Sequence, residues 1–138
     1  GNAFYDFNSG PITPLPEVVG TTTAGAATYT SRTCNYERVG RLCFVTLSFA
    51  WSAHTGTGGV KITGLPYAAA SGTEQVLPIA WRFYDVGGAD KTAVARTVAG
   101  ASTLLLLSSD DQSSGDQIEV PLAATCGLML ITGCYRVL

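Results

Sequence analysis

The sequence predicts an all-β protein, an antiparallel β-sandwich or jelly roll, from three observations. Apolar residues recur in short runs with a period of two, which places every second side chain on one face of a strand. Gly, Ser, Thr and Asp, the residues typical of turns, separate these runs. No stretch has the apolar spacing of an amphipathic helix. With 138 residues, the chain has the size of one domain.

The first twenty residues predict an extended lead-in. Pro11, Pro14 and Pro16 lie here with Gly10 and Gly20. Because proline has no amide hydrogen, this composition disfavours a helix or a central strand. We therefore expect residues 1–20 to arrive from another part of a longer protein, and residues 21–138 to form a single β-sandwich domain. The Thr- and Ala-rich start of that domain suits a strand or a loop.

Residues 41–51 form the clearest predicted strand. Odd-numbered positions from 43 to 51 are apolar, whereas Thr46 and Ser48 fall on the other face, which is the pattern of a half-buried strand. The glycine-rich residues 54–59 predict a loop, and residues 60–63 predict a return strand. Together these segments predict a β-hairpin with a long connection.

Further strands follow at similar spacing. Pro66 ends the return strand, since proline cannot donate a hydrogen bond to a ladder. Turn-forming residues then separate the remaining predicted strands, which span residues 75–84, 92–98, 102–108, 117–122 and 128–136. About seven or eight short strands of this kind favour a sandwich or jelly roll.

The composition favours an oligomer. Hydrophobic residues make up 46% of the chain and charged residues 13%, about half the usual charged share. One copy therefore has too little polar surface to cover itself, and we expect a subunit interface. No apolar run approaches the roughly 20 residues that span a bilayer, so membrane insertion is not expected. The net charge of −2 and the dispersed basic residues disfavour binding to nucleic acid.

The four cysteines, Cys34, Cys43, Cys126 and Cys134, suggest thiols rather than a metal site. They lack Cys-x-x-Cys spacing and a nearby histidine, which argues against zinc. A core of this size does not require disulfides, and two of the cysteines lie in strand-like runs, so we expect buried free thiols. Two disulfides, in any of three pairings, remain the alternative.

Few side chains suggest catalysis, and we assign no catalytic residue, metal or cofactor. His54, the only histidine, lies in a glycine-rich loop, where local hydrogen bonding or exposure is expected. Asp110, Asp111 and Asp116 share a loop that lacks EF-hand spacing and suits a solvated turn better than a calcium site. Sequence alone selects no glycosidase acid pair among the remaining candidates Glu74, Asp85, Asp90 and Glu119.

The densest aromatic and polar cluster spans residues 81–85. Such a surface stacks on sugar rings or anchors a protein interface. Candidate ligand-binding residues from this cluster and the acidic loop are Trp81, Arg82, Tyr84, Asp85, Asp110 and Asp111. Alternatively, strand alternation buries either Trp81 and Phe83 or Arg82 and Tyr84 in core or intersubunit packing.

Six segments together resemble a known family. They are residues 23–29, 36–40, 41–51, 54–58, 62–67 and 131–136, among which the Gly-Leu-Pro tripeptide after the glycine loop is the most specific. On these segments the chain resembles the C-terminal, distal-tip domains of bacteriophage tail fibres and tailspikes. Residues 68–124 carry no such likeness.

The resemblance implies a β-sandwich that forms a parallel homotrimer at the distal end of a virion fibre after synthesis in the host cytoplasm. There it would bind a bacterial surface polysaccharide or outer-membrane protein through the candidate residues above. Leu105 and Leu107 would lie between subunits, because their run is more apolar than one sheet face requires. Two alternatives remain, a purely structural trimerisation clamp for an upstream fibre or depolymerase, and a lectin-like or glycan-degrading domain.

Overall fold

The computed structural model describes residues 7–72, 74–82, 84, 91–110 and 118–138. These residues contain strands and loops, and no helix long and apolar enough to span a membrane occurs among them. The strands are β1 (Phe7–Pro11), β2 (Glu17–Gly20), β3 (Ala27–Val39), β4 (Leu42–His54), β5 (Val60–Thr63), β6 (Val76–Arg82), β7 (Lys91–Thr97), β8 (Thr103–Asp110), β9 (Ile118–Glu119) and β10 (Cys126–Arg136).

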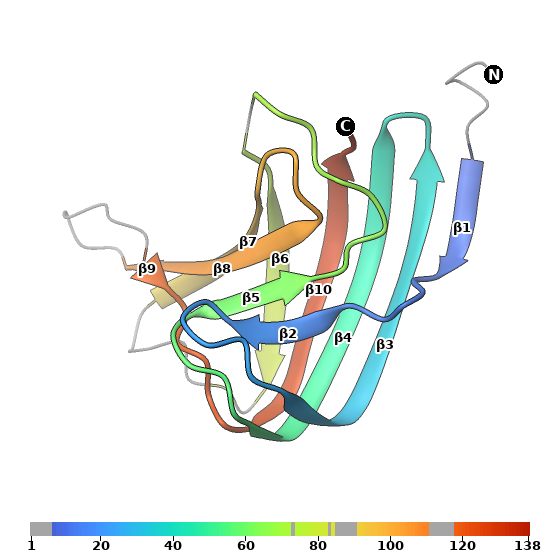
Figure 1. Cartoon of the computed structure of the whole chain (residues 1–138). Helices are drawn as coiled ribbons and strands as arrows, with labels where there is room; N and C mark the ends of the chain where they lie inside the picture. Colours follow the sequence, from blue (N-terminus) through green and yellow to red (C-terminus); the bar gives the residue numbers. More distant parts are fainter. Residues whose placement is uncertain (1–6, 73, 83, 85–90, 111–117) are drawn as a thin grey trace.

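The strands join into one continuous antiparallel path. Its order is β1-β3-β4-β10-β6-β7-β8-β5-β2, with β9 added beside β8. The path curls, so that β2, β5 and β8 pass across β3, β4 and β10 (Figure 1). The predicted antiparallel all-β class is confirmed, and its form is a curled sheet open between β1 and β2 rather than two unconnected sheets.

The inner face of β4 is the centre of the core. Its alternate residues from Cys43 to Trp51 are at most 2% exposed, which confirms the half-buried strand predicted from their spacing. Buried residues of β2, β5, β8 and β10 belong to the same cluster, among them Val18, Val60, Ile62, Leu104, Leu106, Met129 and Ile131. The two halves of the curled sheet therefore share one hydrophobic core.

The long strand β3 was not predicted, because its inner face is not a run of aliphatic residues. Cys34 is buried, but its neighbours toward the core include Tyr29, Tyr36 and two arginines. The arginines lie over tyrosine rings, Arg32 at 4.2 Å from the Tyr29 centroid and Arg38 at 4.5 Å from that of Tyr67. Guanidinium stacking lets a cation lie flat against an apolar layer. Inward positions of β3 can therefore be occupied by arginines, and the sequence of this strand does not show the alternation of apolar and polar residues that predicts a half-buried strand.

The predicted hairpin between residues 41–51 and 60–63 is wrong, although both strands exist. β4 pairs with β3 and β10, whereas β5 pairs with β2 and β8. The connecting loop crosses between the two halves of the sheet because its amides bond elsewhere: Thr55 donates to the carbonyl of Ala26, and Thr57 donates to that of Thr23. Gly25, at φ +65°, also lies against Gly56 with no room for a side chain.

Residues 7–20 are extended, as predicted, but they lie within the sheet. β1 pairs with β3, β2 pairs with β5, and both Ile12 and Val18 are core residues. The expected boundary after residue 20 thus does not separate two structural units. The prolines fit because Pro11 lies on an edge strand, where a missing amide hydrogen costs no ladder bond.

The curl depends on β6, which pairs with both halves of the sheet. Residues 79–82 pair with β10, and residues 76–78 pair with β7. At the point where β6 leaves β10, Leu77 folds over Gly133, and a Cβ added to Gly133 would lie 3.2 Å from the Leu77 Cγ. Leu77 is itself fully buried, so it has little room to move aside.

Replacing Gly133 should therefore destabilise the fold. We expect Gly133→Val to lower the free energy of unfolding by about 1–3 kcal/mol, the usual cost of overpacking a core. The matched control is Thr132→Val on the exposed face of the same strand, with an expected change within about 0.5 kcal/mol. Urea denaturation of both variants measures this, and equal midpoints would show that the corner tolerates a larger residue.

Candidate functional site

Trp81 and Tyr84, two candidate ligand-binding residues, pack against the core. Their rings stack with centroids 4.7 Å apart and planes 22° apart. Tyr84 also meets Trp51 edge-on at 5.9 Å, and Trp51 meets His54 at the same centroid distance. Both candidates are half-buried and belong to the shell around the core. Packing was the alternative left open by the sequence, but strand alternation predicted that only one of the two would be buried, together with either Phe83 or Arg82; Tyr84 instead follows the end of β6 and stacks on Trp81.

Tyr84 and Trp51 use their polar atoms within the chain. The Tyr84 hydroxyl donates to the carbonyl of Pro121 at 2.6 Å and accepts from the amide of Ala123 at 3.1 Å. The Trp51 Nε1 donates to the Ala123 carbonyl at 3.0 Å. The cluster therefore fastens the segment before β10 to the core, which is a structural role.

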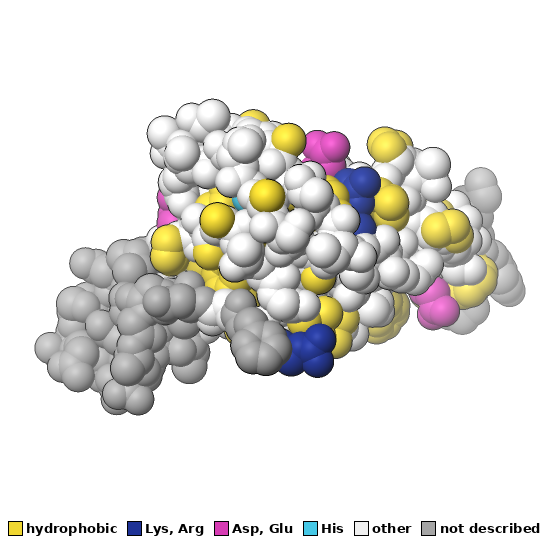
Figure 2. Space-filling view, turned by 90° about the horizontal axis from the view of Figure 1, so that it is seen from below, with side chains coloured by type: hydrophobic (Ala, Val, Ile, Leu, Met, Phe, Trp, Pro, Cys, Tyr) yellow, Lys and Arg dark blue, Asp and Glu magenta, His cyan; other side chains and the backbone are white. Residues whose placement is uncertain are grey.

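Two of the other candidates, Arg82 and Asp110, lie within the described residues. Arg82 is exposed at the end of β6. Asp110 lies in β8 opposite Lys91, while Asp85 and Asp111 lie outside the described residues. Seen from below, isolated charged side chains interrupt a surface of mainly uncharged groups (Figure 2).

His54 bonds locally, which is one of the two alternatives expected from the sequence. Its Nδ1 accepts from the amide of Gly56 at 2.9 Å, so the proton resides on Nε2, which donates to the carbonyl of Val18 at 2.7 Å. Both ring nitrogens are therefore occupied in joining the loop after β4 to β2. This arrangement offers no free base for catalysis.

The described carboxylates of the candidate acid pair also have partners. Glu74 lies 3.6 Å from Arg96, and Glu119 accepts from the Thr21 hydroxyl at 2.8 Å. Among the described residues, no group of His, Cys, Asp or Glu is arranged to hold a metal ion. Asp85, Asp90 and Asp116 lie outside those residues.

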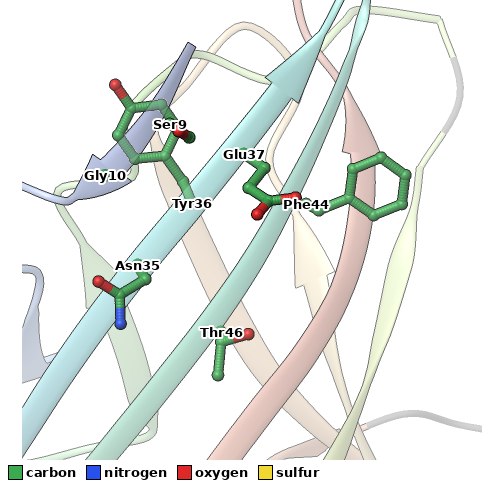
Figure 3. Close-up of a pocket in the computed structure, with 7 residues that line it drawn as sticks. All are labelled: Ser9, Gly10, Asn35, Tyr36, Glu37, Phe44 and Thr46. Atoms are coloured by element: carbon green, nitrogen blue, oxygen red, sulfur yellow. The ribbon is translucent and has the colours of Figure 1, made fainter. Parts of the chain in front are cut away.

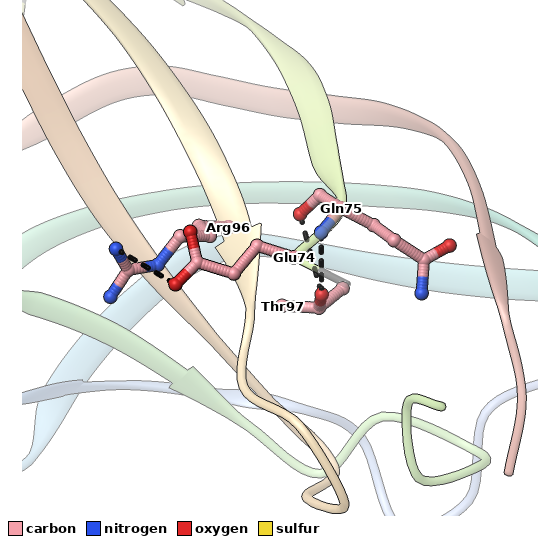
Figure 4. A network of polar contacts seen from close by, with 4 residues as sticks. All are labelled: Glu74, Gln75, Arg96 and Thr97. Carbon is pink, nitrogen blue, oxygen red and sulfur yellow. Dashed lines mark hydrogen bonds and ion pairs between the residues drawn. The ribbon is translucent and has the colours of Figure 1, made fainter. Parts of the chain in front are cut away.

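A polar network beside β6 holds the strand ends together (Figure 4). Thr97 is 2% exposed. Its hydroxyl accepts a hydrogen bond from the amide of Gln75 at 3.1 Å, and its amide donates to the Gln75 carbonyl at 2.8 Å. The Gln75 side chain accepts from the amide of Arg136 at 2.6 Å and donates to its carbonyl at 3.3 Å. The amide group of Gln75 thereby substitutes for a paired strand at the end of β10.

All four cysteines are free, and three of them are buried as expected, while Cys134 is exposed. Cys134 follows the inward-facing Gly133, so alternation places it on the outer face of β10. Burial raises the pKa of the Cys34 and Cys126 thiols to about 11, and it also raises the pKa of Cys43. The buried thiols are therefore protonated and poor nucleophiles at neutral pH.

Leu105 and Leu107, the candidate interface residues, point away from the core. Their neighbours Leu104 and Leu106 are fully buried, so alternation places the candidates on the outer face of β8. Cross-strand register puts Leu105 between Lys61 and Arg96, and Arg96 is opposite Val76. The same register puts Leu107 opposite Val94, which is opposite Pro78. We call this outer surface of β6, β7 and β8 the apolar face. Val76 is 57% exposed, whereas Leu107 is 6% exposed and has little surface left to bury.

A second outer surface, on β1, β3 and β4, contains a shallow hollow of about 470 Å³ (Figure 3). Its lining residues are Ser9, Gly10, Asn35, Tyr36, Glu37, Phe44 and Thr46. Register explains the grouping: Glu37 lies between Ser9 and Phe44 in one cross-strand row, and Asn35 lies opposite Thr46 in the next. Gly10 leaves the edge open, because a Cβ added there would meet nothing within 4 Å.

Sequence reasoning missed this hollow, although one signal for it was present. The alternation that buries Cys43 and Val45 necessarily places Phe44 on the solvent side. An aromatic residue at the outward position of a strand is a marker of a binding surface. Its polar neighbours come from β1 and β3, which the sequence did not predict as strands.

Comparisons with known proteins complete these observations. No protein-family model matches the chain, and no curated protein matches its sequence. Among solved structures, the crystal structure of the Dettilon tailspike protein (gp208) is similar, with a TM-score of 0.69 over 94% of this chain and 14% sequence identity. The chain spans 24% of the length of that protein. The likeness establishes a shared fold.

The structural role of Tyr84 predicts the effect of removing its hydroxyl. Tyr84→Phe should lower the free energy of unfolding by about 1–2 kcal/mol, because the Pro121 carbonyl and the Ala123 amide each lose a partner. Chemical denaturation measures the change. A variant as stable as the parent would show that water replaces the hydroxyl without loss.

The thiols predict both reactivity and pH dependence. At neutral pH, Ellman's reagent should modify Cys134 rapidly and the other three cysteines only on unfolding. Because the folded pKa of Cys34 and Cys126 lies above the ordinary thiol value of 9.0, their stabilisation is complete below pH 9 and is lost as the pH rises toward 11. Denaturation midpoints measured between about pH 8 and about pH 11 should therefore fall less steeply in Cys34→Ala than in the parent. Rapid modification of all four thiols would contradict the buried assignment.

Proposed function

We propose that this chain is a domain of a bacteriophage tailspike or tail fibre that assembles as a homotrimer and binds a host surface receptor, a bacterial polysaccharide. The observation that carries the proposal is the fold shared with a tailspike protein over 94% of the chain. The segments that resemble distal-tip domains support it independently, because they were identified from sequence. The place of the domain would be the virion, at the distal end of the fibre.

The apolar face supports the trimer. Val76 is 57% exposed and Leu105 is half-buried on one cross-strand row of an outer sheet surface, in which Lys61 and Arg96 flank Leu105. The two aliphatic side chains of this row face water in a single copy. Burying them between subunits would remove this cost. A sandwich-like subunit with its curled sheet open on one side is compatible with parallel packing about a three-fold axis.

The role we propose is binding without catalysis. Glu74 and Glu119, the described members of the candidate acid pair, are engaged by Arg96 and Thr21. A glycan-degrading domain is therefore the weaker hypothesis, and release of reducing sugar ends from host polysaccharide by this domain would establish it instead.

A structural clamp is the second candidate function, and one observation favours it. Trp81 and Tyr84, the aromatic residues best suited to a sugar, serve the core. A clamp would set the register of an upstream shaft and bind no receptor. A glycan array without signal, combined with failure of the parent protein to assemble when this domain is deleted, would support the clamp.

The oligomeric state is the first test. Light scattering on the eluting peak should give a mass near three times 14.3 kDa. Leu105→Arg should give single chains, because the new cation would lie between Lys61 and Arg96 on the neighbouring strands, and an unpaired charge buried between subunits costs several kcal/mol, on the order of 3–5. The matched control, Leu42→Arg, changes an exposed leucine on the outer surface of β4 and should remain trimeric. A monomeric parent would refute the trimer, and a trimeric Leu105→Arg or a monomeric Leu42→Arg would refute the assigned face.

A further inference from the structure

The hollow on β1, β3 and β4 has the position that a binding site needs in the proposed trimer. Glu37 and Phe44 project outward, since the residues that flank Phe44 in β4 point into the core. The apolar face belongs to β6, β7 and β8, in the other half of the curled sheet. Subunit contact through the apolar face would therefore leave the hollow open to a ligand.

Its side chains suit a sugar ring. Phe44 is 45% exposed. The aliphatic hydrogens of a pyranose stack well on an exposed aromatic ring of this kind. Glu37, directly across the strand pair, supplies acceptors, while Asn35 and Thr46 in the next row supply donors and acceptors. Figure 3 shows Glu37 beside Phe44 on β3 and β4, with Asn35 and Thr46 further along the same two strands and the Phe44 ring turned away from them.

The spacing matches one or two sugar units. Residues two apart along a strand are about 7 Å from each other, and neighbouring strands are about 5 Å apart, so the two rows form a grid with the dimensions of a pyranose and its hydroxyls. The hollow, at about 470 Å³, lies within the range of small-molecule sites. It is shallow, which suits one segment of a long chain better than an enclosed ligand.

The charge of the lining residues restricts the kind of sugar that the hollow can bind. Among the described residues that line the hollow, Glu37 is the only carboxylate, and none is Lys or Arg. Nothing in that lining would balance a uronate, sialate or sulfate, and Glu37 would repel them. Within the described part of the chain, the Glu37 carboxylate has no hydrogen bond or ion pair, so it is available to hydroxyls or to an ammonium group.

We propose that this hollow is a saccharide subsite that accepts a neutral or amino sugar, with Phe44 beneath the ring and with Glu37 and Asn35 bonded to its polar groups. The proposal rests on the receptor-binding function proposed above, since it names the site and the class of sugar. It assigns recognition to residues of β1, β3 and β4 rather than to Trp81 and Tyr84.

The test is a titration of the isotope-labelled domain, followed by amide chemical shifts. The probes are glucose, N-acetylglucosamine, glucosamine and glucuronic acid, each up to tens of millimolar. The three neutral or amino sugars should shift residues 9, 35, 37, 44 and 46 and leave Trp81 unchanged, whereas glucuronic acid should bind at least tenfold more weakly. Phe44→Ala should weaken binding at least tenfold, and Phe44→Tyr should retain it.

The matched control is Phe7→Ala, which removes an exposed aromatic ring from β1 outside the hollow. It should bind sugars like the parent, and both alanine variants should keep the parent's thermal midpoint. A second assay, retention of the domain on purified host polysaccharide, separates two kinds of failure. Retention unaffected by Phe44→Ala and Glu37→Gln would overturn the subsite and leave the proposed function standing. No retention of the parent on any bacterial polysaccharide would overturn both.

Discussion

The fold depends on burying the inner face of β4. This strand has neighbours on both sides, β3 and β10, and its alternate residues from Cys43 to Trp51 form the floor of the core. A single sheet cannot bury such a face by itself, so the path must turn until β2, β5 and β8 cover it. The turn is possible because β6 divides its pairing between β10 and β7, and because Gly133 leaves space for Leu77 where the strands separate.

Closing the core in this way leaves two outer surfaces, and that of β1, β3 and β4 also exposes large apolar side chains, Phe7, Val39, Leu42 and Phe44. The apolar face carries Val76 and Leu105, aliphatic side chains that face outward from strands whose inner sides are already buried. The other surface places Glu37, Asn35 and Thr46 together in the hollow. In the proposed trimer, one surface would contact another copy and the other would bind a polar ligand, so assembly and recognition would use different strands.

The sequence predicted those elements whose stability comes from plain hydrophobic alternation. β4 and β10 were predicted with nearly their observed bounds, as were β7 and β8. β3 was missed because Arg32 and Arg38 cover its inner side by stacking on tyrosines. β1 and β2 were missed because Pro11 and the two prolines between these strands suggested a lead-in. Pairing was harder still, since β4 and β5 are consecutive strands that belong to different halves of the sheet. The candidate site was hard to predict for the same reason. The residues of the aromatic cluster are neighbours in the sequence, whereas the residues of the hollow are brought together only by the register of β1, β3 and β4.

Shallowness of the hollow is consistent with its proposed role because of multivalency. An open site that covers one or two sugar units leaves much of its ligand in water and therefore binds weakly. Three copies about one axis convert later binding events into intramolecular ones, which raises avidity by about two to four orders of magnitude without further contacts. A repetitive polysaccharide offers the same unit at many positions, so weak subsites can each find a partner. Under this proposal the oligomer would be part of the recognition mechanism, and the apolar face would contribute to receptor affinity without touching the receptor.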